Sequence, residues 1–233
     1  MSVRLGKPFP EFSCETSLGF ISSFHEWIGD NWAILFSHPA DFTPVCTTEL
    51  ARVAQLAPEF ARRNTKLIAV SVDSAESHRH WIKDIVSFGN IAADGDIVKK
   101  IEEEKFPYPI IDDSKRKLID LLGMEDPDEL NRSGMPLAAR AVFIIGPDRK
   151  LKLSLLYPAT TGRNFDEILR ALSSLQLTAA HPVATPADWH PGDACMVVPS
   201  LDNEAAQQRF GDIRGLAVPS GRNYLRMVNL KPS

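Results

Sequence analysis

The chain has 233 residues, enough for one large domain or for one domain with a smaller appendage. Apolar residues make up 44% of it and charged residues 24%, which allows a core of ordinary size. The net charge of −4 argues against a dedicated nucleic-acid-binding protein, because such proteins usually carry a basic excess.

Signals for export, membrane insertion and disulfide bonding are missing from the pattern. The first residues resemble neither a secretory signal nor a transit peptide, and no apolar run is long enough to span a bilayer. The three cysteines are widely spaced, without a C-x-x-C pair, which excludes a disulfide framework and a zinc ribbon. We therefore predict a protein of a reducing, cytoplasmic compartment.

The first third of the chain indicates a strand, a helix and a second strand. Residues 32–38 (WAILFSH) and 66–73 (KLIAVSVD) are apolar on both faces, as in buried strands. Between them, apolar residues recur at spacings of three and four from Leu50 to Phe60, which predicts a helix that Pro58 kinks. This order is typical of a parallel sheet in an α/β protein.

The rest of the chain predicts further elements and a boundary. In chain order they are helices over 77–88 and 114–123, an antiparallel hairpin of 139–146 with 151–157, and a helix that Asn164 caps and whose apolar stripe ends near Leu175. After Leu177 the sequence becomes proline-rich, with one short helical pattern at DNEAAQQRF. We predict a main domain over 1–177 and a small domain over 178–233, which packs on the first domain or on a second subunit.

One cysteine has an unusual local setting, in the stretch SHPADFTPVCTTEL at residues 37–50. Thr43 suits the cap of a helix and Pro44 its first position, which puts Cys46 in the first turn. Unpaired backbone N–H groups and the helix dipole stabilise a thiolate there. A lone cysteine is more often a small buried apolar residue, but the polar neighbours and the preceding His38 favour a reactive thiol.

These residues carry a family resemblance. PADFTPVC, residues 39–46, matches the P-x-x-x-T-x-x-C signature of peroxiredoxins. GMPLAARAVFIIGPD, LYPATTGRNFDEILRALSSLQL and VATPADWHPGD resemble the one-cysteine, peroxiredoxin-6 type, so the resemblance spans almost the whole chain. It implies a thioredoxin-like α/β fold, with a central mixed sheet flanked by helices and a small C-terminal domain. It also implies an antioxidant thiol-dependent peroxidase that reduces hydrogen peroxide and organic or lipid hydroperoxides. The resemblance further implies a homodimer that needs no metal or other cofactor.

The resemblance assigns catalytic roles to four residues. Cys46 matches the peroxidatic cysteine, which attacks the O–O bond and becomes a sulfenic acid. Thr43 and Arg140 match the groups that hold the thiolate and the peroxide, and Pro39 matches the proline that shields the thiolate from water. The chemistry needs such donors, because negative charge develops on the leaving oxygen as the O–O bond breaks.

Three further residues are expected to support the pocket. His38 matches a histidine that binds peroxide or joins a hydrogen-bond network, although a strand-end histidine bonded to backbone is an alternative. Glu49 and Arg163 match charged positions near the pocket. We expect no metal site at His78 and His80, because residues two apart do not share a helix face and a solvated surface explains them better.

The cycle after oxidation is open to more than one interpretation. Without a C-x-x-C pair, the sulfenic acid needs an external reductant, for which glutathione, thioredoxin and ascorbate are all candidates. Cys14 and Cys195 are interpreted as structural, and a two-cysteine cycle in which Cys195 resolves Cys46 is the alternative. A redox sensor or holdase, in which oxidation of Cys46 changes partner binding, is a second alternative.

The sequence departs from the family that it resembles at a phospholipase motif. Some proteins of the peroxiredoxin-6 type have phospholipase A2 activity, attributed to a serine in a G-x-S-x-G-like stretch with a histidine and an aspartate. Here the stretch is GDNWA, with Asn31 in place of the serine and Ala33 in place of the second glycine. Asparagine has no hydroxyl nucleophile, so we predict no such activity and interpret His25 and Asp148 as a surface residue and a turn residue.

Overall fold

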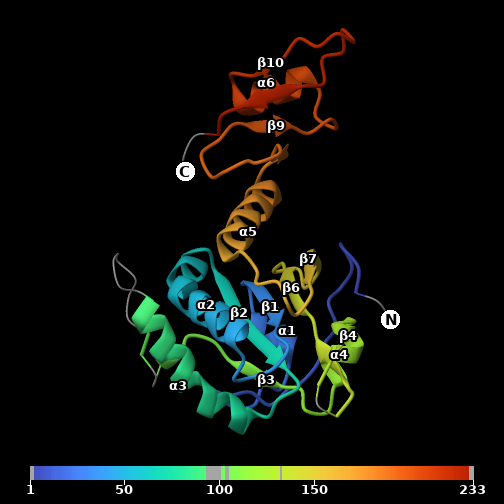
Figure 1. Cartoon of the computed structure of the whole chain (residues 1–233). Coiled ribbons are helices and arrows are strands. Elements are labelled where there is room, and N and C mark those ends of the chain that lie inside the picture. The colour runs from blue at the N-terminus through green and yellow to red at the C-terminus, as the bar shows by residue number, and fades with distance from the viewer. Residues whose placement is uncertain (1–2, 93–100, 103–104, 132, 231–233) are drawn as a thin grey trace. The chain divides into compact units, whose positions relative to one another are not determined.

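The computed structural model describes residues 3–92, 101–102, 105–131 and 133–230. The chain divides into two compact units, residues 1–165 and 166–233 (Figure 1). The predicted boundary at Leu177 lies inside helix α5, Phe165–Ala180. The division precedes most of this helix because the helix packs with the C-terminal residues: Leu177 contacts the apolar core of the C-terminal unit. Composition changes only after the helix, which is why the sequence suggested the later position.

A five-stranded mixed sheet forms the centre of the first unit. Its strands follow the order β3-β2-β1-β6-β7 and are β1 Trp32–Ser37, β2 Thr65–Ser71, β3 Ile110–Asp112, β6 Arg140–Ile145 and β7 Leu151–Tyr157. Strands β1, β2 and β3 are parallel, whereas β6 and β7 run antiparallel to their neighbours. The predicted parallel pair and the predicted hairpin are therefore confirmed.

Helices and a small ribbon surround this sheet in the described part of the unit. The helices are α1 Phe24–Ile28, α2 Pro44–Arg62, α3 Ala75–Ala92 and α4 Lys117–Leu122. Helices α2 and α3 contact each other and pack on β2 and β3 (Figure 1). The ribbon of β4 Glu125–Leu130 and β5 Pro136–Ala138 was not predicted, because its first strand, EDPDEL, is acidic and contains a proline.

Burial follows the predicted apolar faces. In α2, Leu50, Val53 and Phe60 are buried, while Pro58 is exposed inside the helix. A second buried cluster joins α1 and α4 to the central strands, and Phe24 belongs to it, with its ring centroid 4.5 Å from that of Phe12. Buried apolar contacts on both faces hold the central strands in place, so their carboxyl ends form a rigid base for the loops that come after them.

The second unit is a small domain of its own. Helix α5 leads into a four-stranded antiparallel sheet in the order β10-β11-β9-β8, made of β8 Val183–Ala184, β9 Cys195–Val197, β10 Arg214–Gly215 and β11 Arg226–Val228. Helix α6, Asn203–Phe210, matches the predicted helical pattern. The small core of this unit includes Trp189, Cys195 and Ala206.

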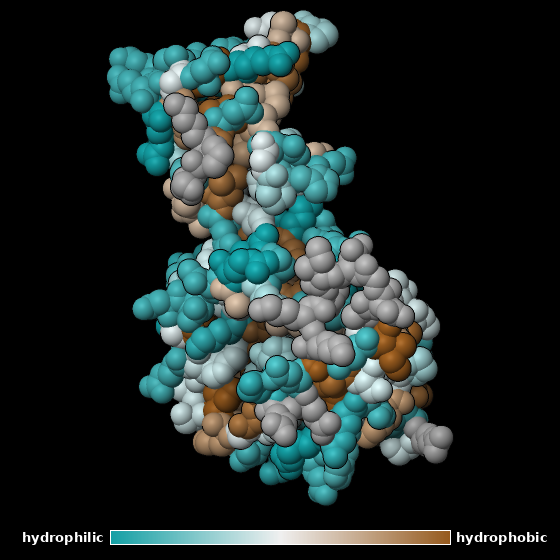
Figure 2. Space-filling view, turned by 90° about the vertical axis from the view of Figure 1, so that its left-hand side faces the viewer, coloured by the Kyte–Doolittle hydropathy of each residue, from teal (hydrophilic) through white to brown (hydrophobic). Residues whose placement is uncertain are grey.

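The surface carries apolar side chains in separate patches between hydrophilic ones (Figure 2). Exposed examples in the larger unit are Phe42, Ile91 and Leu156. Among the residues described, no helix combines the length and the apolar character needed to cross a membrane.

Candidate active site

Cys46 lies in the first turn of α2, as predicted. The helix begins with Thr43 at the cap position and Pro44 as its first residue, directly after the loop that leaves the carboxyl end of β1. Phe42 precedes the cap with φ at 54°, in the left-handed region, which turns the chain into the helix. The Thr43 hydroxyl does not cap the helix but donates to the carbonyl of Ala40 at 2.9 Å. Its oxygen lone pairs can therefore accept a hydrogen bond from a bound ligand.

Arg140, the first residue of β6, contacts the thiol. Its Nη1 lies 3.3 Å from Cys46 Sγ, and Cys46 is fully buried. Ser37, at the end of β1, holds the backbone on both sides of this arginine. Its hydroxyl donates to the carbonyl of Ala139 at 2.5 Å and accepts from the N–H of Ala141 at 2.9 Å. The guanidinium is thus placed by the pairing of two adjacent strands.

Glu49, one turn after Cys46, connects this arginine to a second one. Its carboxylate accepts from Arg140 Nη1 at 2.8 Å and from Arg163 Nη2 at 2.7 Å, and all three residues are buried. Arg163 also donates its backbone N–H and Nε to Glu49, at 2.6 and 3.0 Å. Burial alone would raise the pKa of Glu49, but the bonds and charge of Arg163, together with the charge of Arg140, outweigh it and lower the pKa.

The charges of this cluster balance only when the thiol is ionised. Arg140 and Arg163 bring two positive charges, and Glu49 brings one negative charge. A Cys46 thiolate supplies the second negative charge, whereas a neutral thiol leaves one buried cation without compensation. The arrangement therefore favours the nucleophilic form of sulfur, together with the backbone N–H groups of the helix start.

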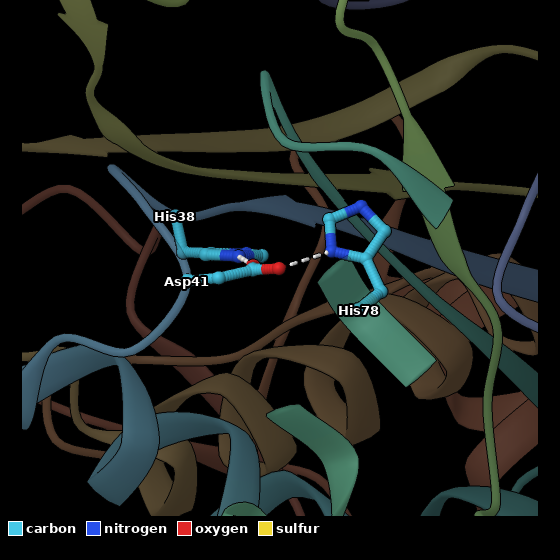
Figure 3. Close-up of side chains that lie close together, drawn as sticks. All are labelled: His38, Asp41 and His78. Carbon is cyan, nitrogen blue, oxygen red and sulfur yellow. Dashed lines mark hydrogen bonds and ion pairs between the residues drawn. The ribbon is translucent and has the colours of Figure 1, made fainter. Parts of the chain in front are cut away.

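His38 and Pro39, which come directly after β1, are both buried. The His38 ring does not bond to backbone: its Nε2 lies 2.9 Å from Oδ1 of Asp41, and His78 Nδ1 lies 2.8 Å from Oδ2 of the same carboxylate (Figure 3). The prediction of a solvated surface was wrong for His78, which is fully buried, and correct for His80, which is exposed. The face of α3 that carries His78 packs toward the sheet, where Nε2 meets the carbonyl of Ile111 at 3.0 Å.

An open groove of about 560 Å³ lies beside the start of α2. Thr43, Pro44 and Thr47 line it from the helix that carries Cys46, and α3 supplies most of the opposite wall. Its apolar side chains are Phe42, Pro44, Trp81, Phe88 and Ile91. A substrate that carries an apolar group thus has a surface directly beside the reactive turn.

The other two cysteines are buried free thiols without the setting of Cys46. Burial raises the pKa of Cys14 to about 12, helped by the charges of Glu15 and Asp113. Burial also raises the pKa of Cys195, more than the hydrogen bond to Trp189 lowers it. Neither thiol is activated as a nucleophile in the folded chain.

The residues at the phospholipase positions are engaged in other contacts. Both ring nitrogens of His25 face acceptors, the Phe9 carbonyl at 2.8 Å and the Glu11 carboxylate at 3.0 Å. The Asn31 amide donates to the carbonyl of Ile28 at 3.0 Å, and Asp148 pairs with Lys152 of strand β7 at 2.7 Å.

An ionisable cysteine at the start of a helix, with an arginine beside it and a mixed thioredoxin-like sheet beneath, defines the class of thiol-dependent peroxidases. Comparisons with known proteins agree. The model of the AhpC/TSA family matches residues 5–154, and that of the C-terminal domain of 1-Cys peroxiredoxin matches residues 174–212. The chain belongs to the AhpC/TSA family and, within it, to the 1-Cys peroxiredoxins.

Relatives match over nearly the full length. A 1-Cys peroxiredoxin of Dirofilaria immitis is 59% identical, covering 97% of both chains, and peroxiredoxin-6 of Rattus norvegicus is 57% identical, covering 95% of both. A crystal structure of a mutant peroxiredoxin 6 of Arenicola marina superposes with a TM-score of 0.90 at 53% identity, over 99% of this chain and 100% of that one. A yeast mitochondrial 1-Cys peroxiredoxin has a TM-score of 0.84 at 39% identity, over 98% and 100% of the two chains.

The protein is thus a thiol-dependent peroxidase, and its structure adds residues that sequence reasoning missed. Ser37 holds the strand that carries Arg140, and Asp41 joins two histidines. Asp41 lies within the signature stretch, so its position was visible, but its partner His78 is 37 residues away. Local patterns do not indicate such a pairing.

Proposed function

We propose that the protein reduces hydrogen peroxide and organic or lipid hydroperoxides in a one-cysteine cycle at Cys46, which an external reductant completes. The main support is the 3.3 Å contact between Arg140 Nη1 and Cys46 Sγ. This contact lies within a cluster whose charges balance when the sulfur is ionised. The catalytic group comprises Cys46, Thr43, Arg140 and Pro39, and His38, Glu49 and Arg163 support it.

The chemical step uses each of these groups. The Cys46 thiolate attacks the hydroxyl oxygen of the hydroperoxide, an S–O bond forms and the O–O bond breaks. Sulfur loses two electrons and becomes a sulfenic acid, while the leaving oxygen departs as alkoxide or hydroxide and takes up a proton. Arg140 and the first N–H groups of α2 stabilise the charge that develops, Thr43 orients the peroxide and Pro39 excludes water.

The reductant comes from outside the chain. Buried Cys14 and Cys195, with their raised pKa values, are poor candidates for resolving the sulfenic acid. The yeast mitochondrial relative was described with a thiol resolving mechanism via glutathione and thioredoxin systems. By analogy we propose a thiol reductant, glutathione or thioredoxin, ahead of ascorbate.

The first test is intact mass after one equivalent of hydrogen peroxide, with and without a sulfenic-acid trap, on the wild type and on Cys46→Ser. We expect a trapped adduct on Cys46 and no disulfide, and no adduct in the variant. A disulfide between Cys46 and Cys195 would replace the proposal by a two-cysteine cycle. An unmodified Cys46 would overturn the assignment of the nucleophile.

Turnover separates an enzyme from a redox sensor or holdase. With glutathione or thioredoxin and its recycling enzyme in excess, we expect many equivalents of peroxide to be consumed per chain. A single equivalent followed by arrest, with every reductant including ascorbate, would favour the sensor. The groove beside α2 supports activity on organic hydroperoxides, so cumene hydroperoxide should turn over as well as hydrogen peroxide.

The lack of a serine at position 31 leads us to propose that no serine-dependent phospholipase A2 activity exists. Asn31 and His25 are engaged in the hydrogen bonds described above, which supports this. Fatty-acid release from phosphatidylcholine vesicles should equal the blank. Robust release that persists in Cys46→Ser would contradict the proposal.

Assembly and location are also proposals. A cytoplasmic homodimer, with the small C-terminal domain (178–233) at its interface, is supported by two features of the chain. Strand β7 lies at the end of the sheet order; the N-terminal segment bonds to its first residue, Leu151, and the edge beyond that residue has no strand partner among the described elements. All three cysteines are free thiols, as in a reducing compartment. Sedimentation equilibrium should give twice the chain mass; a monomer at micromolar concentration would reject the dimer.

A further inference from the structure

A buried carboxylate, Asp41, connects the end of β1 to the start of α3 (Figure 3). Oδ1 faces His38 Nε2 at 2.9 Å, and Oδ2 faces His78 Nδ1 at 2.8 Å and accepts from the Ser77 hydroxyl at 2.7 Å. Its backbone N–H donates to Asp73 at 2.9 Å. Asp41 and both histidine rings are almost completely shielded from solvent, with side chains no more than 1% exposed.

The partners of these atoms determine where the protons lie. His78 faces two acceptors, the Asp41 carboxylate and the Ile111 carbonyl, so each of its nitrogens carries a proton. Burial would raise the pKa of Asp41, but the bonds and charges of His38 and His78 outweigh it and lower that pKa. Asp41 and His78 thus form a buried ion pair whose charges compensate each other.

His38 is left neutral, with one nitrogen free. Burial lowers the pKa of its ring, and the bond and charge of Asp41 offset this only in part. Because Nε2 donates to Asp41, Nδ1 keeps its lone pair. This Nδ1 is buried and has no hydrogen-bond partner among the residues described. A buried acceptor without a partner is costly, so Nδ1 is a site for a donor from outside the chain, either a water or the hydroxyl of a bound substrate.

The same three side chains are near enough to one another to hold a metal ion. The distances between the ring nitrogens and the carboxylate oxygens favour hydrogen bonds over a bound ion. Each carboxylate oxygen lies at ordinary N–H···O distance from one ring nitrogen, and His78 needs its Nδ1 proton to bond Asp41 while Nε2 bonds Ile111. Metal content is therefore one outcome of the test rather than the proposal.

Contacts connect His38 with the surroundings of the thiol. It comes directly after Ser37, whose hydroxyl holds the backbone beside Arg140. Its ring centroid lies 5.1 Å from that of Trp81, and Trp81 Nε1 donates to the hydroxyl of Thr47 at 3.2 Å. Thr47 is the neighbour of Cys46 in the first turn of α2.

We propose that Asp41, held by protonated His78, is a positioning residue that keeps the His38 proton on Nε2, so that Nδ1 accepts a hydrogen bond from the hydroxyl of the hydroperoxide. This rests on the proposed peroxidase cycle. In the step, the hydroxyl oxygen moves from the O–O bond to sulfur and keeps its hydrogen. The O–O electron pair leaves with the other oxygen, which takes up a proton. His38 Nδ1 can therefore hold the same O–H group before and after transfer, without itself being protonated.

Asp41→Asn tests the tautomer directly. An asparagine can turn its NH₂ group toward His38 Nε2, which moves the ring proton to Nδ1 and changes the acceptor into a donor. We expect the second-order rate constant with hydrogen peroxide to fall by about tenfold, the loss of one hydrogen bond. Alkylation of Cys46 by iodoacetamide, which needs the thiolate but no peroxide site, should stay within about twofold.

The comparison includes a second network variant and a matched control. His78→Leu removes one partner of Asp41 and should lower the peroxide rate by about threefold. Glu76→Gln removes an exposed acidic group two residues away in sequence from His78 and should leave both rates unchanged. Equal losses of peroxide and alkylation rates in Asp41→Asn would indicate a general structural effect and overturn the positioning role.

Two measurements on the wild-type protein do not depend on whether the variants fold. Long-range ¹H–¹⁵N NMR of the histidine rings should show His38 with an unprotonated Nδ1 and His78 protonated at both nitrogens. A protonated His38 Nδ1 would overturn the inference, and so would one equivalent of divalent metal in the purified protein that Asp41→Asn lacks. If wild-type Cys46 forms no sulfenic acid, the proposed function fails instead. An active wild type with an unaffected Asp41→Asn rejects only this inference.

Discussion

At the scale of single residues, the site is organised by charge rather than by the thiol alone. Glu49 lies between two arginines, and Arg140 divides its donors between that carboxylate, the thiol and the Ala159 carbonyl, which it contacts at 2.6 and 2.9 Å. A planar guanidinium with several fixed donors can serve all three acceptors at once. A lysine has one point of charge and cannot.

Arg140→Lys is therefore not a conservative change. We expect the second-order rate constant with hydrogen peroxide to fall by about 100-fold, as for the loss of one aligned donor in a buried site. Stopped-flow tryptophan fluorescence measures it, with Arg149→Lys in an exposed turn as the matched control. A rate within about threefold of wild type would mean that charge alone suffices.

Glu49→Gln removes the only negative charge that faces both Arg140 and Arg163 among the described contacts. Breaking one partner of a buried ion network costs about 3–5 kcal/mol of unfolding free energy. Urea unfolding should show this loss. The control is Glu59→Gln, at a surface pair with Arg63, which should cost less than about 1 kcal/mol. Similar small losses for both would contradict a structural role for the network.

At the scale of elements, the adjacency of β1 and β6 brings the two halves of the site together. Strand β1 ends where the loop to Cys46 begins, and β6 begins at Arg140. The Ser37 hydroxyl joins the two strands where their backbones separate. It donates to the carbonyl of Ala139 and accepts from the N–H of Ala141, in place of backbone partners. Strand pairing and catalytic geometry therefore depend on the same side chain.

Ser37→Ala leaves a buried carbonyl and a buried N–H without this partner. We expect a loss of about 1–3 kcal/mol in unfolding free energy and a lower peroxide rate, because Arg140 is no longer held. Ser154→Ala on the exposed side of β7 is the control, expected to change stability by less than about 0.5 kcal/mol. Lost stability with an unchanged peroxide rate would separate strand pairing from catalysis.

At the scale of the whole molecule, buried carboxylates link folding to pH. Burial would raise the pKa of Glu49 and of Asp41, but in both cases the cationic partners outweigh it and the pKa falls below its ordinary value of 4.5 or 3.8. An unfolded chain binds protons at these ordinary values, so it takes up more protons on acidification than the folded chain does. Their stabilising contribution is complete above the ordinary pKa and is lost as pH falls through the lowered one.

We therefore expect the urea midpoint to be insensitive to these two groups above about pH 5 and to fall steeply below about pH 4.5. A pH series of urea unfolding measures this. The dependence should be weaker in Glu49→Gln, which has one such carboxyl fewer. A flat midpoint down to about pH 3, or an equal slope in the variant, would show that Glu49 is not held ionised.

Local sequence patterns were enough to predict the elements that carry the site and the reactive turn, although not the β4–β5 ribbon. The strand–helix–strand order, the hairpin and the start of α2 at Thr43 and Pro44 were all predictable, because propensity, capping and apolar spacing act over one or two turns of chain. The signature around Cys46 is equally local. These patterns thus indicated an α/β protein with a reactive cysteine, and the resemblance to the peroxiredoxin signature implied the peroxidase activity.

The sequence patterns did not predict which distant residues surround Cys46, because those contacts form only in the folded chain. Glu49 pairs with arginines 91 and 114 residues later, and Asp41 with a histidine 37 residues later. His78 was misjudged as solvated because the face of a helix that becomes buried depends on the elements that pack against it. The contact boundary at the start of α5 differs from the compositional change after it for the same reason. Ion pairing and burial depend on spatial neighbours, which the folded sheet supplies and local spacing does not encode.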